Sequence, residues 1–128
     1  MTLVNFDKKL PLVIVPVSIK LDTAIFDFNF AIDTGASISL INIDVLYALG
    51  FQKEHAIRTI QTITASRQET AYEFELPNVK ALGLIRRNFK IISRSLPSGL
   101  GIDGLLGLNF FRNKELLINF KSSEVRLL

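Results

Sequence analysis

Short segments rich in Val, Ile, Phe and Thr follow one another along most of this chain, and they constrain its fold more than any other feature. Their bounds are 12–21, 24–32, 57–65, 69–76, 89–92, 116–120 and 125–128. Segments of this length and composition, bounded by turn residues, are typical of β-strands. The turn-forming stretches Asp22-Thr23 and Lys121-Ser122-Ser123 separate the first and the last two segments, so each pair is predicted to form a hairpin. We therefore expect an all-β fold.

One helical pattern interrupts the strands, between Asn42 and Gly50. Asn42 can cap its start, the apolar residues 45, 46 and 49 share a face, and Gly50 suits the position just after its end. A second, shorter helix is predicted from Leu108 to about Asn113. The chain thus contains little helix, in short pieces.

The two halves of the chain echo each other. In the first, the apolar strand 26–32 leads to Asp33-Thr34-Gly35 and then to a helix; in the second, the strand 89–92 is followed by Asp103-Gly104 and a short helix. We interpret the halves as two versions of one structural plan.

Composition excludes several classes of function. The 128 residues, of which 48% are hydrophobic, suit a single folded domain spanning residues 1–128 and do not suit a disordered tail. With no cysteine and one histidine, the chain has no disulfide, thiol nucleophile or conventional zinc site, and we expect no cofactor. The net charge of +3 is modest and Arg86-Arg87 is interpreted as a solvated turn, so we expect no nucleic-acid partner.

The apolar stretch from Leu10 to Ile19 is interrupted by Pro11 and Pro16 and is too short to span a bilayer. No secretory signal is recognisable at the N-terminus. We therefore expect no membrane segment and a cytoplasmic location. A removed signal or anchor, or a longer parent protein, is the alternative.

The segment Phe30 to Ser37 is the most informative for chemistry. Asp33 directly follows an apolar strand and precedes a small hydroxyl residue and a glycine, which places its carboxylate at a strand end where the chain turns sharply. Gly35 allows backbone N–H groups to approach the carboxylate, and the Thr34 hydroxyl can bond to neighbouring backbone. The loop itself is therefore predicted to hold an acid in a fixed position.

Two motifs carry a family resemblance. Ala31 to Ser37 resembles the active-site loop of aspartic peptidases, and Ile102 to Phe111 resembles the apolar-apolar-glycine segment near the end of retropepsin-like domains. The resemblance implies a closed β-barrel of the acid-protease type with a flap hairpin over the substrate. That hairpin would be residues 59–76 with a tip near Ala65 to Gln68, although its tip residues, Thr64-Ala65-Ser66-Arg67, lack the glycine common in flaps.

The resemblance also implies an activity. Because the chain holds one Asp-Thr-Gly, a homodimer would be needed to bring two Asp33 carboxylates together across a twofold axis. The pair would share a proton and activate water to hydrolyse peptide bonds in a peptide or protein substrate. The implied catalytic residues are Asp33, Thr34 and Gly35, with Thr34 bonding across to the partner loop, and the implied substrate-binding residues are Ala36, Ser37, Ala65 and Ser66.

Other interpretations of these residues remain open. Asp33-Thr34-Gly35 alone is also compatible with an ordinary turn, and Asp103 is a rival acid that could complete a dyad within one chain. Ser37 and His55 could be imagined as nucleophile and base, but nothing nominates an oxyanion hole for them. The main competing function is a catalytically silent retropepsin-like module for dimerisation or peptide binding.

A glycine pattern in the same region suggests a nucleotide site. Gly99, Gly101 and Gly104 match the spacing of a dinucleotide-binding fingerprint. That fingerprint needs a helix opening at the third glycine, and the following residues favour a short helix and a hairpin instead. We therefore do not expect nucleotide binding.

Overall fold

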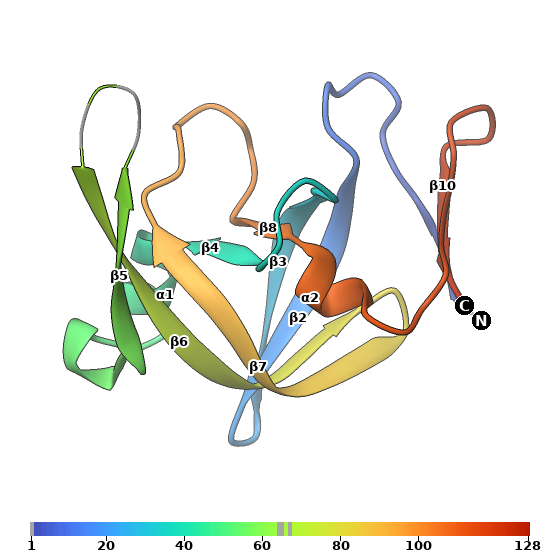
Figure 1. The fold of residues 1–128 in the computed structure, drawn as a ribbon. Helices are drawn as coiled ribbons and strands as arrows, with labels where there is room; N and C mark the ends of the chain where they lie inside the picture. Colours follow the sequence, from blue (N-terminus) through green and yellow to red (C-terminus); the bar gives the residue numbers. More distant parts are fainter. Residues whose placement is uncertain (1, 64–65, 67) are drawn as a thin grey trace.

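The computed structural model describes residues 2–63, 66 and 68–128, and it confirms a fold built mainly of strands (Figure 1). The strands are β1 (Leu3–Asn5), β2 (Ile14–Leu21), β3 (Ala24–Ile32), β4 (Leu40–Asn42), β5 (Arg58–Ile63), β6 (Gln68–Ala81), β7 (Leu84–Arg94), β8 (Gly104–Leu106), β9 (Leu116–Asn119) and β10 (Glu124–Leu127). The helices are α1 (Ile43–Ala48), the 3₁₀ turn η1 (Lys53–His55) and α2 (Leu108–Phe111). Both predicted hairpins, β2–β3 and β9–β10, are present.

A closed barrel forms the main body of the fold. Its strands follow the order β2-β3-β8-β4-β7-β6, and β6 returns to pair with β2, which closes the ring. β5 is added outside the ring, on β6. The closed β-barrel predicted from the family resemblance is therefore confirmed.

Alternation in β2 shows why these strands curve around a core. Val15, Val17 and Ile19 are fully buried, whereas the residues between them face outward to different degrees. Val15 lies opposite Phe30 in β3, which is also fully buried. Successive side chains of a strand point to opposite faces, so this period of two places one face of the hairpin inside the barrel.

β6 and β7 are longer than the sequence predicted. Their pairing has a gap at Pro77 and Asn88, and Asn88 has a φ of 50°, so the ladder is distorted where proline cannot donate a hydrogen bond. Beyond that point β6 reaches β2 and closes the barrel. The interpretation of Arg86-Arg87 as a turn is wrong: both lie within β7, and Arg86 donates to the carbonyl oxygens of Phe110 and Arg112.

The internal echo corresponds to a twofold pattern of strand pairing. β3 pairs in parallel with β8, β7 pairs in parallel with β4, and β4 and β8 pair with each other in antiparallel fashion. Each half thus supplies a long strand, a loop and a short strand, and the short strand of one half lies beside the long strand of the other. This exchange places the loop after β3 against the start of α2.

The predicted helix between Asn42 and Gly50 is confirmed as α1. The Asn42 side chain accepts a hydrogen bond from the Asp44 amide, and Gly50 follows the helix with a φ of 96°. Leu46 is fully buried in the core of the barrel. The shorter predicted helix is α2, which buries Phe110 and Phe111.

The ends of the chain form a separate small sheet with the order β1-β10-β9, and the two termini lie side by side (Figure 1). β10 is the central strand and buries Val125 and Leu127. The three-residue strand β1 was not predicted. None of the helices in the described part of the chain has the length or the apolar run that crossing a bilayer requires.

Candidate active site

The loop after β3 holds the Asp33 carboxylate through backbone hydrogen bonds. The Asp33 amide donates to the Leu106 carbonyl oxygen in β8 at 2.9 Å, which fixes the start of the loop. The Gly35 amide donates to Asp33 Oδ1 at 3.0 Å, and the Ala36 amide donates to the Asp33 carbonyl oxygen at 3.2 Å. Asp33 is half-buried, so its carboxylate is both anchored and accessible.

The absence of a side chain at position 35 leaves room for the close approach of this carboxylate. A Cβ atom added there would lie 3.2 Å from Asp33 Oδ1, which is tighter than most real contacts of a Cβ atom. The sequence predicted this approach, and the structure contains it.

Within the described residues, the Thr34 hydroxyl does not make the hydrogen bond to neighbouring backbone that the sequence suggested. The Thr34 side chain is exposed. Ala36 is half-buried and Ser37 is exposed on the same loop. The loop therefore presents an unused hydroxyl beside the carboxylate.

Gly107 lies against the backbone of this loop. A Cβ atom at Gly107 would lie 2.6 Å from the Ala36 carbonyl oxygen and 2.9 Å from the Ile38 carbonyl carbon. The Leu108 amide donates to the same Ala36 oxygen at 2.8 Å. The loop after β3 and the start of α2 are therefore in direct backbone contact.

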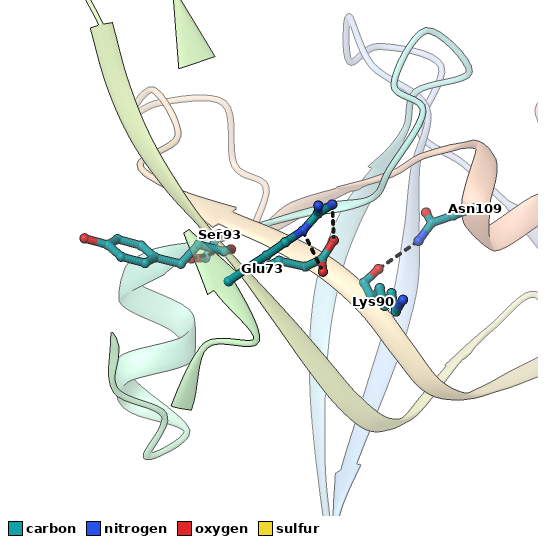
Figure 2. Close-up of polar contacts among 6 residues, drawn as sticks. Glu73, Lys90, Ser93 and Asn109 are labelled. Carbon is teal, nitrogen blue, oxygen red and sulfur yellow. Dashed lines mark hydrogen bonds and ion pairs between the residues drawn. The ribbon is translucent and has the colours of Figure 1, made fainter. Parts of the chain in front are cut away.

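Ser39 is a buried polar residue that joins the two halves of the site. Its hydroxyl accepts from the Gly107 amide at 2.9 Å and donates to Asn109 Oδ1 at 2.8 Å, and its own amide donates to the same Oδ1 at 2.7 Å. Asn109 Nδ2 donates to the Lys90 carbonyl oxygen in β7 at 2.8 Å (Figure 2). This network ties the end of the Asp33 loop to α2 and β7.

Replacing Ser39 with alanine is expected to lower the free energy of unfolding by about 1–3 kcal/mol, because the buried Gly107 amide would lose its acceptor. The matched control is Ser37→Ala on the exposed part of the same loop, which should stay within about 0.5 kcal/mol of the wild type. Urea unfolding of the three proteins measures both values. Equal stabilities of the two variants would show that the Ser39 network contributes nothing.

Asp103 has a structural role at the other end of the β3–β8 ladder. Its Oδ2 accepts from the Asn29 amide at 2.9 Å, and its own amide donates to the Asn29 carbonyl oxygen at 2.8 Å. Asp33 follows Asn29 by four residues along the extended strand, which is roughly 13 Å at about 3.3 Å per residue. A dyad of Asp33 with Asp103 in one chain is therefore excluded.

The other interpretations from the sequence do not correspond to a site. His55 is exposed, and its Nδ1 accepts from the Gln52 amide; within the described residues no contact links it to Ser37. Gly104 begins strand β8 rather than a helix, which removes the dinucleotide hypothesis. A Cβ atom there would lie within 2.4 Å of the Leu40 carbonyl oxygen, so this glycine serves packing.

The predicted flap corresponds to the β5–β6 hairpin, which projects from the barrel (Figure 1). Gln68, which was placed in its tip, is instead the first residue of β6. Ser66 lies exposed between the two strands, and Ala65 lies outside the described residues. Among the described residues no hydrogen bond or ion pair joins Ser66 to the Asp33 loop, so the substrate-binding role of the hairpin stays a prediction.

Comparison with known proteins places this geometry in context. A family profile described as aspartyl protease matches residues 15–110, which include the Asp33 loop and Gly107. The crystal structure of a retropepsin-like aspartic protease from Rickettsia conorii aligns with a TM-score of 0.68 and 22% sequence identity, over 98% of this chain and 96% of that chain. A search of curated proteins by sequence found no match. The structural alignment shows that the two chains share a fold nearly from end to end.

Proposed function

This chain belongs to the aspartyl protease family and has the retropepsin-like fold, and from this premise we propose that it is an aspartic endopeptidase active as a homodimer. Each subunit, with residues 1–128 as one domain, would supply one Asp33 to a shared catalytic pair. The observation that carries the proposal is the Asp33 carboxylate, which Gly35 holds in place at the end of β3. Asp103 is engaged elsewhere, so a second acid would have to come from another copy.

The surface around Thr34 supports a dimer. The Thr34 side chain is exposed and borders a hollow of about 370 Å³, whose other lining residues belong to α2, to the turn after it and to the start of β9. In an isologous dimer the same patch of each subunit meets its copy across the twofold axis. Thr34 of each subunit would then bond to the loop of the partner, which gives its unused hydroxyl a role.

Two Asp33 carboxylates in contact would hold one proton between them, because two negative charges in direct contact repel each other strongly. The ionised carboxylate would accept a proton from a water molecule that attacks the peptide carbonyl. The protonated one would donate a hydrogen bond to the developing oxyanion, and a proton would then pass to the leaving nitrogen. This route uses only the side chains of the pair and the bound water.

The substrate in this proposal is an extended peptide that pairs with strand edges while its side chains occupy subsites. The proposed contacts are Ala36, Ser37, Ala65 and Ser66. A cytoplasmic location stays a prediction.

Cleavage of a diverse peptide library at increasing protein concentration tests the proposal. Specific activity is expected to rise with concentration as dimers form, because only the dimer contains two Asp33 residues. Sedimentation of the same samples gives the dimer fraction at each concentration. Full activity in a sample that is wholly monomeric would reject the shared pair, and a folded dimer without cleavage would favour the silent peptide-binding module.

A further inference from the structure

Among the strands that the structure describes, the first residues of β6 have a neighbour on one side only. β7 pairs with β6 only as far as Tyr72 opposite Ser93, whereas β6 extends back to Gln68. After Arg94 the chain turns away from β6 toward β8 (Figure 1). In the described part of the chain, residues 68–71 therefore pair with β5 on one side and with no strand on the other. An unpaired edge of this kind can accept an extended peptide as an added strand.

A groove runs along this edge. It consists of two hollows, of about 320 and 310 Å³, which share Thr70, Arg94 and Ser95 in their walls. The first hollow continues past Tyr72 to Tyr47 of α1 and Lys53 of η1. We call these six residues and the open edge of residues 68–71 the β6 groove.

Two cations, Arg94 and Lys53, line the β6 groove. Arg94 is half-buried, and Lys53 Nζ lies 5.5 Å from the centre of the Tyr72 ring. Neither cation has a carboxylate partner in the part of the chain that the structure describes. Glu69 also borders the second hollow but has an interaction of its own. A carboxylate brought into the groove could form an ion pair with Arg94, and another with Lys53 beside the Tyr72 ring.

Partly buried hydrogen bonds and an ion pair fix the strands that form the walls of the groove. Ser93 is fully buried, and its hydroxyl donates to the Tyr72 carbonyl oxygen at 3.2 Å (Figure 2). The Arg58 guanidinium contacts both oxygens of the buried Glu73 carboxylate at 3.2 Å, which fixes β5 to β6 next to the groove (Figure 2). The site is therefore formed before a ligand arrives.

We propose that the β6 groove binds an extended acidic peptide segment, with its backbone along residues 68–71 and its carboxylates on Arg94 and Lys53. None of the loop residues 33–37 lines the groove, so this site is additional to the proposed catalytic one. We infer that this segment is part of the substrate, outside the residues that bind at Asp33. In this respect the inference rests on the proposed function.

Binding can be measured without catalysis. The protein is the Asp33→Asn variant, and the probe is a fluorescein-labelled peptide Ala-Thr-Glu-Val-Glu-Thr-Ala, followed by fluorescence anisotropy. The same peptide with both Glu changed to Gln should bind about tenfold or more weakly, because hydrogen bonds to charged groups are lost. N-methylation of alternate peptide amides should weaken binding similarly, because it blocks strand pairing. Equal affinity for the Glu and Gln peptides would overturn the proposal.

Matched variants locate the site. Arg94→Gln and Lys53→Gln should each weaken binding of the acidic peptide about tenfold. Arg87→Gln and Lys80→Gln remove the same charges from exposed strand positions outside the groove and should leave binding unchanged. A loss as large in these two controls would mean that the peptide senses only net charge, which contradicts a defined groove.

Kinetics tests whether the substrate supplies the segment. Any peptide that the wild type cleaves is extended with either the acidic or the Gln sequence. The ratio of kcat/KM for the acidic over the neutral substrate should be about ten through a lower KM, and it should fall toward one in Arg94→Gln but not in Arg87→Gln. A ratio of one in the wild type rejects the substrate as the source. If the proposed function is wrong, no peptide is cleaved, but the acidic peptide still binds in the anisotropy experiment. The two failures can therefore be told apart.

Discussion

Asparagine at position 33 is expected to abolish peptide hydrolysis and to leave the fold in place. The amide can neither accept the proton of the attacking water nor share a proton with its partner, and positioned acid–base catalysis contributes about 10²–10⁴-fold to rate. Because a dimer of the Asp33→Asn variant loses both acid and base, we expect activity to fall by about 10⁴-fold or more. Folding should persist, since the side-chain amide oxygen of the variant can still accept a hydrogen bond from the Gly35 N–H.

The matched control is Asp103→Asn. Asp103 Oδ2 accepts only from the Asn29 amide among the described residues, and an amide oxygen can take that place. This variant should therefore cleave peptides like the wild type. Thermal unfolding of both variants establishes that they are folded, and cleavage of one fluorogenic peptide compares them. Wild-type turnover by Asp33→Asn, or equal loss in Asp103→Asn, would contradict the proposed chemistry.

The hairpins and α1 were predictable from sequence because their signals are local. A strand period of two, a turn between two strands, or a cap such as Asn42 depends on residues that are neighbours along the chain. β4 and β8 were missed for the opposite reason: each is three residues long and is a strand only because it pairs with partners distant in sequence. The extension of β6 past Pro77 was missed because a proline ordinarily ends a strand prediction.

In the candidate site, too, the residues with local signals were predicted and those with distant partners were missed. Asp33 and Gly35 were predicted because the carboxylate, its turn and the close-approach glycine lie within three residues. Ser39 was missed, because a serine near a strand has no distinctive pattern, and its partners Gly107 and Asn109 are far along the chain. Asn109 lies within the segment from Ile102 to Phe111 that resembles retropepsin-like domains, but only the folded chain reveals that its side chain connects the loop to β7.

The same contact between distant segments makes Gly107→Ala the second substitution with a large expected effect. Gly107 has extended backbone with a φ of −98°, so alanine suits its conformation and only space is at issue. The added Cβ would lie 2.6 Å from the Ala36 carbonyl oxygen, against 3.4 Å for ordinary contact. Relieving the overlap requires the Asp33 loop to move by several tenths of an ångström.

Such a shift is expected to lower kcat/KM for peptide cleavage by up to about 10²-fold, since misplacing catalytic groups by about 1 Å costs on that order. Overpacking should also lower the free energy of unfolding by about 1–3 kcal/mol. Gly50→Ala is the control: Gly50 has a φ of 96° and open space around it, so alanine there strains the backbone without touching the loop. If both variants lose stability but only Gly107→Ala loses turnover at a temperature where both are folded, loop position controls the chemistry. Equal turnover in the two would mean that the loop tolerates the displacement.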